Sequence, residues 1–170
     1  MLTFLVAADR TGTAALAAPT KRVDAKDACT LLGVSKVQRA FGGPVKTQRG
    51  GPLPTAVCYY LVGTDPARAP GGTLTATIEY RKGDRDATNA IEAVERVVDP
   101  DVAGGVEVEA LGGVGKDAYV YPDDGQLIVA ATRTLAFRLL WAPAGQSAAL
   151  TPETRRALLR LAKDTVKRAS

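Results

Sequence analysis

Apolar and polar positions alternate with two different periods along this chain. Between Ala87 and Val98, apolar residues recur every three or four positions and charged residues take the opposite face, which predicts an amphipathic helix. Between Thr73 and Tyr80, apolar residues occupy every second position, with Leu74, Ala76, Ile78 and Tyr80 on one side, which predicts a half-buried antiparallel strand. Residues 57–62 are apolar on both faces, so we expect that strand to be well buried.

The other segments complete the expected order of elements. Asp27 is placed to cap a short helix that ends at Gly33, and Ser35 with Gln38 has the spacing of a capping box for a helix that ends at Gly42. Residues 44–54 and 63–72 are rich in proline and glycine and are predicted to be loops. Thr151 and Pro152 are expected to open a last helix. Further strands are predicted at 106–109, 118–121, 127–132 and 134–141.

This order predicts an α+β fold for residues 21–170, taken as a single domain. We expect a mainly antiparallel sheet with helices packed on one face, in the order α-β-β-α-β-β-β-β-α. Residues 1–20 are expected to form an extended N-terminal arm or the remnant of a leader. The apolar stretch 2–8 lacks a preceding positive charge and is too short for a complete signal peptide. Either a longer leader or anchor is truncated, or this is a mature form that begins with the arm.

The composition excludes several function classes. The chain has 170 residues and no histidine, which excludes a Ser-His-Asp triad, a Cys-His pair and the common histidine-containing zinc sites. Its net charge of +4 comes from a basic segment at 21–50 and a basic C-terminal helix, with an acidic middle between them. Only 5% of the residues are aromatic and none lies in the basic tail, so we expect no nucleic-acid partner. No stretch is long and apolar enough to predict a membrane span.

The basic side chains of the last helix have two interpretations. Such a row is ordinarily a solvated helix face, and the other interpretation is docking to an acidic protein or lipid surface. With two apolar residues of the arm, the candidate partner contacts are Phe4, Leu5, Arg155, Arg156, Arg160, Lys163 and Lys167.

The two cysteines are the most informative pair. Cys29 lies in the first predicted helix and Cys58 in the first predicted strand, 29 positions later. A disulfide between them would close a loop of about 30 residues and stabilise the fold by roughly 3.6 kcal/mol in the chain-entropy model. The alternative is a pair of buried free thiols in a reducing compartment. We favour the disulfide, and with it an oxidising compartment.

Motifs that carry catalytic or metal chemistry are weak. The glycines of residues 111–115 precede a predicted strand instead of a helix, so they predict a turn and no phosphate loop. Glu107 and Glu109 share one face of a strand and are expected to be solvated. Residues 99–101 and 123–125 have the character of turns and lack the spacing of a calcium loop. We therefore predict no catalytic residues, no metal and no cofactor.

Four features stand together over about residues 24–168: the opening Asp27-Ala28-Cys29-Thr30-Leu31-Leu32, Cys58, the Gly113-Val114-Gly115-Lys116-Asp117-Ala118-Tyr119 turn and the closing helix. In these features the chain resembles a family of actinobacterial exported lipoprotein domains of unknown function. The resemblance implies a secreted or cell-envelope location and a Cys29–Cys58 bridge, with no assigned catalytic residues. The lipid-bearing cysteine of such lipoproteins is absent near the start of this chain.

Two functions follow as expectations. The first is a non-catalytic secreted or envelope module that binds or assembles with another protein, in part through the N-terminal arm. The second is a carrier of a small apolar ligand or lipid, with a pocket between helices and sheet where Ala76, Ala130, Ala131 and Ala136 leave space.

Overall fold

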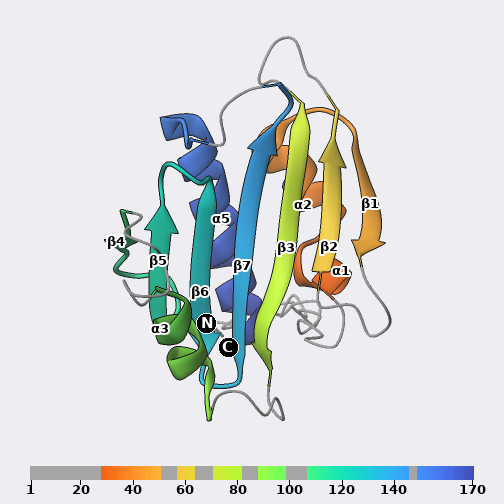
Figure 1. Ribbon diagram of the computed structural model, residues 1–170. Helices are drawn as coiled ribbons and strands as arrows, with labels where there is room; N and C mark the ends of the chain where they lie inside the picture. The colour runs from red at the N-terminus through yellow and green to blue at the C-terminus, as the bar shows by residue number, and fades with distance from the viewer. Residues whose placement is uncertain (1–27, 51–56, 64–70, 82–87, 99–106, 146–148) are drawn as a thin grey trace, which may run out of the picture.

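The computed structural model describes residues 28–50, 57–63, 71–81, 88–98, 107–145 and 149–170. These residues form an antiparallel sheet and four helices, which confirms the predicted α+β class (Figure 1). The strands lie in the order β1-β2-β3-β7-β6-β5-β4, and every neighbouring pair is antiparallel. The elements in chain order are α1 (Ala28–Leu31), α2 (Val34–Phe41), β1 (Val45–Gly50), β2 (Val57–Val62), β3 (Gly72–Arg81), α3 (Ala90–Val98), β4 (Glu109–Ala110), β5 (Asp117–Tyr121), β6 (Gln126–Thr132), β7 (Leu135–Pro143) and α5 (Pro152–Ala169).

Three of the helices cover one face of the sheet, as predicted. Helices α1, α2 and α5 pack there against the inward-facing residues of the strands, and the largest fully buried side chains in this core include Tyr60, Phe137 and Leu139. Phe41 of α2 stacks on Trp141 of β7 with ring centroids 4.3 Å apart. We call this side the helix-covered face.

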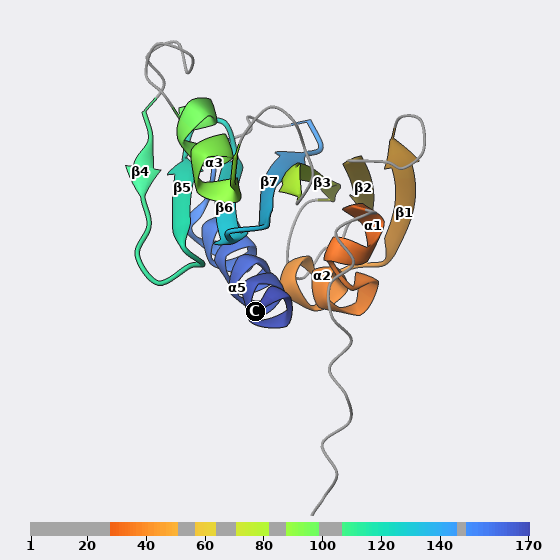
Figure 2. The same ribbon diagram turned by 90° about the horizontal axis from the view of Figure 1, so that it is seen from below.

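Helix α3 lies on the opposite face and covers only part of it (Figure 2). Its Ala90 and Val94 pack with Tyr121 and Ile128 in a second buried cluster. Ile128 stands between Leu127 and Val129, which belong to the first core, so the two clusters must lie on opposite sides of β6.

The predicted alternation of β3 is wrong at Tyr80, because the strand contains a bulge. Leu74, Ala76 and Ile78 face the first core as expected, whereas Tyr80 packs under α3. The register with β7 shifts between Ile78 and Tyr80, and one extra residue in a strand turns the next side chain to the other face. The Tyr80 hydroxyl donates a hydrogen bond to the Thr88 carbonyl at 3.1 Å.

The helix ends agree with the sequence in part. Thr151 caps α5 by accepting a hydrogen bond from the Thr154 N–H, and Pro152 occupies the first turn, as predicted. The capping box at Ser35 is wrong: Gly33 is the N-cap of α2, without a side-chain cap, and Ser35 lies inside the helix. Asp27, the expected cap of α1, lies outside the described residues.

Strand β1 was not predicted. The loop expected over residues 44–54 contains Val45–Gly50, which pairs with all of β2. Of these residues only Val45 packs against the core, so the segment shows no alternation. An edge strand needs one neighbour and no buried face, and flanking prolines and glycines concealed it.

Candidate functional site

The predicted disulfide is present and ties α1 to β2. Cys29 and Cys58 are bonded with their Cα atoms 5.0 Å apart, and the described residues contain no free cysteine. The alternative of two free thiols is therefore wrong. A disulfide of this kind indicates an oxidising, extracytoplasmic environment.

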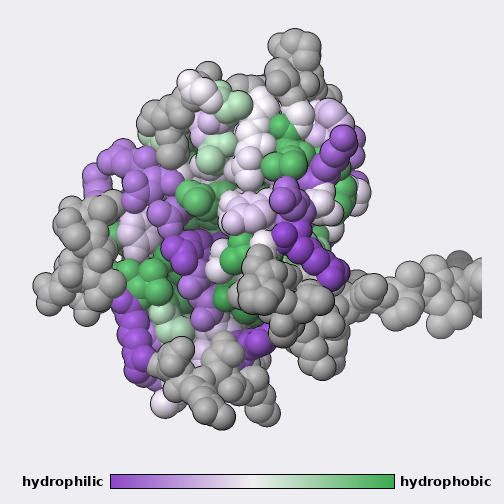
Figure 3. Space-filling model, turned by 45° about the vertical axis from the view of Figure 1, so that its right-hand side comes forward, coloured by the Kyte–Doolittle hydropathy of each residue, from purple (hydrophilic) through white to green (hydrophobic). Residues whose placement is uncertain are grey.

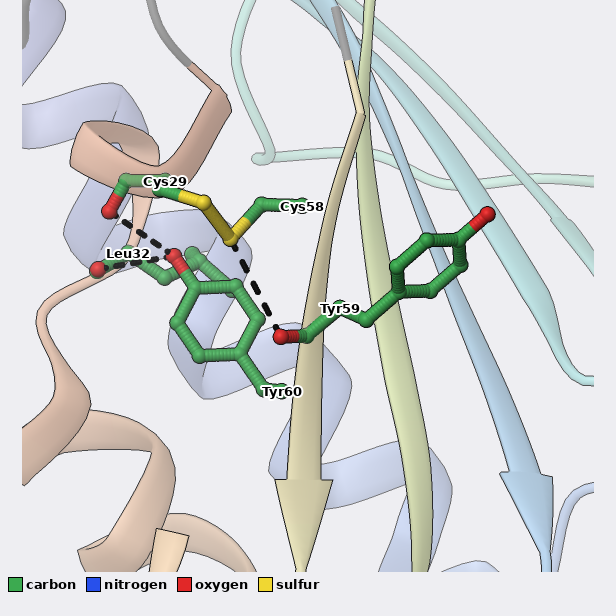
Figure 4. The surroundings of a disulfide bond; sticks show 5 residues. All are labelled: Cys29, Leu32, Cys58, Tyr59 and Tyr60. Carbon is green, nitrogen blue, oxygen red and sulfur yellow. Dashed lines mark hydrogen bonds between the residues drawn. A yellow bond between two sulfur atoms is a disulfide. The ribbon is translucent and has the colours of Figure 1, made fainter. Parts of the chain in front are cut away.

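Tyr60, two residues further along β2, completes the attachment of α1 (Figure 4). Its buried hydroxyl lies 2.9 Å from the carbonyl of Leu32 and 3.2 Å from that of Cys29, and donates to them. Arg168 of α5 donates a further hydrogen bond to the Leu31 carbonyl at 2.6 Å. The last carbonyls of a helix have no partner within it, so these contacts satisfy them. The disulfide and its surroundings are thus a structural element that fixes α1.

The same strand presents a different set of side chains on its other side. We define the open half of the sheet as the face opposite α1 and α2 on strands β1, β2, β3 and the adjoining part of β7. Register pairs place its members in rows across the four strands, whereas α3 covers β5, β6 and the ends of β3 and β7 at Tyr80 and Ala136. The members are Lys46, Gln48, Val57, Tyr59, Leu61, Thr73, Thr75, Thr77, Leu140 and Ala142.

Tyr59 and Leu61 are the apolar centre of this open half. They are 36% and 41% exposed, and they are two of the three large apolar side chains that stand out as exposed among the described residues. Figure 4 shows the Tyr59 ring directed away from Tyr60 and the disulfide. The prediction that β2 is buried on both faces is therefore wrong for one face. In Figure 3, apolar and weakly polar side chains gather on this side of the molecule between strongly hydrophilic ones.

The Tyr59 ring lies over Gly50 of the neighbouring strand. A Cβ atom added at Gly50 would stand 2.7 Å from Cε2 of the ring, closer than any real contact of this kind. The absence of a side chain at Gly50 therefore leaves room for the ring, which stays partly exposed.

Polar residues border the open half toward α3. Arg138 of β7 pairs with Glu79 of β3 at 2.6 Å and donates a weaker hydrogen bond to Gln126 at 3.4 Å. On the β1 side, Lys46 stands opposite Leu61 and Gln48 opposite Tyr59. The apolar centre is thus flanked by threonines and by a basic side chain.

The basic residues of α5 do not form one patch. Arg155 is bound to Glu109 of β4, and Arg156 pairs with Glu153 of its own helix at 2.9 Å. Arg160 and Lys163 turn toward α2, where they line a groove, and Lys167 is exposed. Sequence reasoning missed Lys36 and Arg39 of α2, which line the same groove. Their separation of three residues on a helix was the available signal.

The remaining sequence candidates are accounted for individually. Glu109 is held by Arg155, and Glu107 lies outside any strand, so the strand expected over 106–109 is reduced to Glu109–Ala110. Gly113 and Gly115 have φ angles of 74° and 68°, which confirms a turn. Residues 122–125 form a turn as predicted. Phe4, Leu5 and residues 99–101 lie outside the described residues.

Within the described part of the chain, neither a metal-binding cluster nor a membrane-spanning helix is present. That part contains no group of three or more cysteine, aspartate or glutamate side chains that could hold a metal ion. None of its helices combines the length and the apolar character that crossing a bilayer requires.

No protein-family model, no curated protein and no solved structure matches the chain.

Proposed function

We propose that this protein is a non-catalytic, exported module that binds another protein through the open half of its sheet. The observation that carries the proposal is the exposure of Tyr59 and Leu61 at the centre of this surface. The rest of the apolar side chains of β2 and β3 are packed in the two cores or half-buried.

The chemistry of the surface favours a protein partner. Tyrosine is enriched at the centre of protein interfaces because it combines a large apolar ring with a hydroxyl. The threonines of β3 alternate with buried residues and add hydroxyl groups beside the apolar centre. Lys46, next to Leu61, favours an acidic side chain on the partner.

Two features support an extracytoplasmic location. The Cys29–Cys58 disulfide belongs to an oxidising compartment. The resemblance to actinobacterial exported lipoprotein domains implies the same location.

A photocrosslinking experiment in cells of the source organism tests the proposal. A benzoylphenylalanine residue replaces Tyr59, and in a matched control it replaces Val34, an equally exposed apolar residue on α2. We expect one discrete adduct with another protein from position 59, its loss when Leu61→Asp is added, and no adduct from position 34.

Three results would overturn the proposal. They are the absence of an adduct from position 59, the same adducts from both positions, or an adduct that contains only a second copy of this chain. The Leu61→Asp protein serves only if its unfolding midpoint equals that of the parent, as expected for an exposed position.

The carrier of a small apolar ligand is the second candidate. Ala76 and Ala131 lie in the first core and Ala136 in the cluster under α3, on opposite faces of the sheet. These alanines thus do not share one space. A hollow of ligand size lies instead at the surface, between α2 and α5.

A further inference from the structure

The groove between α2 and α5 gathers basic side chains over an apolar floor. Its volume is about 410 Å³, within the range of small-molecule sites. Lys36 and Arg39 stand on the α2 side, and Arg160 and Lys163 on the α5 side. Ala40 and Leu161 supply its apolar lining, and Asp164 of α5 adds one carboxylate.

Three of the four cations are not neutralised. Lys36 is bound to Asp164 at 2.9 Å, and this hydrogen bond, with the attraction of nearby bases, lowers the pKa of the Asp164 carboxyl. Within the described part of the chain, no acidic side chain forms an ion pair with Arg39, Arg160 or Lys163. By contrast, Arg155 and Arg156 of the same helix are paired with Glu109 and Glu153.

The gathering of these cations is unfavourable for the fold itself. Arg160 and Lys163 are like charges three residues apart on α5, which destabilises a helix. With Arg39 and Lys36 of α2, the cations that line the groove outnumber its one carboxylate, Asp164. The helix dipole favours a base in the last turn, which accounts for Arg39, but Arg160 and Lys163 precede the last turn of α5. A bound anion would remove the repulsion.

We infer that this groove binds a phosphate group that carries a short apolar substituent, as in a phospholipid headgroup with its first chain atoms or a soluble alkyl phosphate. Arg39, Arg160 and Lys163 would hold the phosphate oxygens, which suit several donors at once. Ala40 and Leu161 would contact the apolar part.

The shape of the groove favours a small ligand over nucleic acid. The helix on one side, α2, has eight residues and is therefore only about 12 Å long. A smaller hollow of about 110 Å³ continues from it beside Phe41, and shares Arg39 and Ala40. Phe41 is 7% exposed and stacked on Trp141, so its ring is not available for base stacking.

Calorimetric titration of the full chain with hexyl phosphate tests this inference. The groove variant carries Arg39→Gln, Arg160→Gln and Lys163→Gln. The matched control, Lys116→Gln, Arg133→Gln and Lys167→Gln, loses the same charge at exposed positions outside both the groove and the open half. We expect hexyl phosphate to bind the parent and the control alike, and the groove variant at least ~10-fold more weakly.

Inorganic phosphate tests the apolar contact, and lipid vesicles test whether the phosphate belongs to a lipid. Inorganic phosphate is expected to bind more weakly than hexyl phosphate, because it lacks contact with Ala40 and Leu161. Co-sedimentation with phosphatidylglycerol vesicles, and not with phosphatidylcholine vesicles, would assign the phosphate to a lipid headgroup. Binding of hexyl phosphate without vesicle binding would assign it to a soluble molecule.

Several outcomes would overturn the inference. Equal binding of hexyl phosphate by the parent and the groove variant would show that the groove is not the binding site. Equal weakening in the control variant would show that binding depends only on the net charge of the protein. Equal affinities for inorganic phosphate and hexyl phosphate would show that the apolar substituent makes no contact. Tighter binding of a single-stranded oligonucleotide than of hexyl phosphate would assign the surface to nucleic acid. Because the groove and Tyr59 lie on opposite faces of the sheet, these results leave the proposed protein interface unaffected.

Should the triple variant fail to fold, Arg160→Gln alone gives the same test with a smaller change. Arg160 is exposed, and its substitution removes a like-charge neighbour of Lys163. The unfolding midpoint of Arg160→Gln is therefore expected to stay close to that of the parent, and its measurement by circular dichroism separates loss of the site from loss of the fold.

Discussion

Alternate residues of strand β2 lie on opposite faces of the sheet. Cys58, Tyr60 and Val62 enter the core under the helices, whereas Tyr59 and Leu61 stand on the open half. On the first face a cross-link, a buried hydroxyl and close packing fix the position of each side chain. On the second face a glycine on the neighbouring strand leaves room for the Tyr59 ring, and the surface stays accessible. The comparison separates residues that hold the fold from residues that are free to bind.

The largest expected difference in the free energy of unfolding is between two substitutions in β7. Phe137 is fully buried on the helix-covered face, and Phe137→Ala is expected to lower the free energy of unfolding by about 3–5 kcal/mol because it leaves a cavity. Leu140 is half-buried on the open half, and Leu140→Ala is expected to cost about 1 kcal/mol or less. Urea denaturation measures both values, and equal losses would contradict the division between the two faces.

Removal of the disulfide tests the attachment of α1. The double variant Cys29→Ala, Cys58→Ala is expected to lose about 2–4 kcal/mol, because its unfolded state regains the entropy of a loop of 29 positions. Reduction of the parent protein should give a similar loss. Addition of the same reductant to the double variant is the control and should change nothing. A parent protein whose stability does not respond to reduction would show that the bridge contributes nothing.

Neighbouring tyrosines give a smaller, matched contrast. Tyr60→Phe removes the donor to the carbonyls of Cys29 and Leu32 in a buried site, and is expected to cost about 1–3 kcal/mol. Tyr59→Phe, on the exposed side of the same strand, is expected to change the stability by less than about 0.5 kcal/mol. Thermal unfolding of the pair measures the difference, and a larger effect at Tyr59 would reverse their assigned roles.

The smallest effect concerns the salt bridge between α2 and α5. The pKa of the Asp164 carboxyl is below its usual value because Lys36 donates a hydrogen bond to it. A lowered folded-state pKa contributes stability above the unfolded-state value of about 3.9, and this contribution is lost as the pH falls through the folded-state pKa. The Asp164 side chain is 53% exposed, so solvent screening limits the gain to about 1 kcal/mol at most.

Asp164→Asn is therefore expected to lower the stability slightly at neutral pH and to leave it unchanged in strong acid. Unfolding midpoints measured across this pH range for the parent and the variant give the difference directly. Glu107→Gln, at an exposed glutamate, is the control for the loss of one negative charge. A difference that persists in strong acid would contradict the role of the ionised carboxyl.

Local patterns predicted much of the fold. The β6–β7 hairpin, the turn at residues 122–125 and the Thr151 cap of α5 each depend on contacts between residues close in sequence. Strand β1 was missed because an edge strand with no buried face has no distinctive pattern. The turn of Tyr80 to the other face was missed because a bulge depends on how β3 meets β7.

The candidate surfaces were less predictable than the fold. Tyr59 and Leu61 read as buried because the sequence of β2 does not reveal which face a helix covers. The α5 bases were recognised, but their separation into paired residues and groove residues depends on where β4 and α2 pack. The cysteine pair was predictable because only two cysteines are present.

Alternate residues of β2 face the core and the open half, and this restricts which changes of the strand evolution can accept. Insertion or deletion of one residue inside β2 would exchange the faces of every residue beyond it, and so move Tyr60 out of the core. Substitutions at Tyr59 and Leu61 disturb neither the disulfide nor the contacts of Tyr60. Relatives of this protein should therefore keep the length of β2 while its outward-facing residues are free to vary.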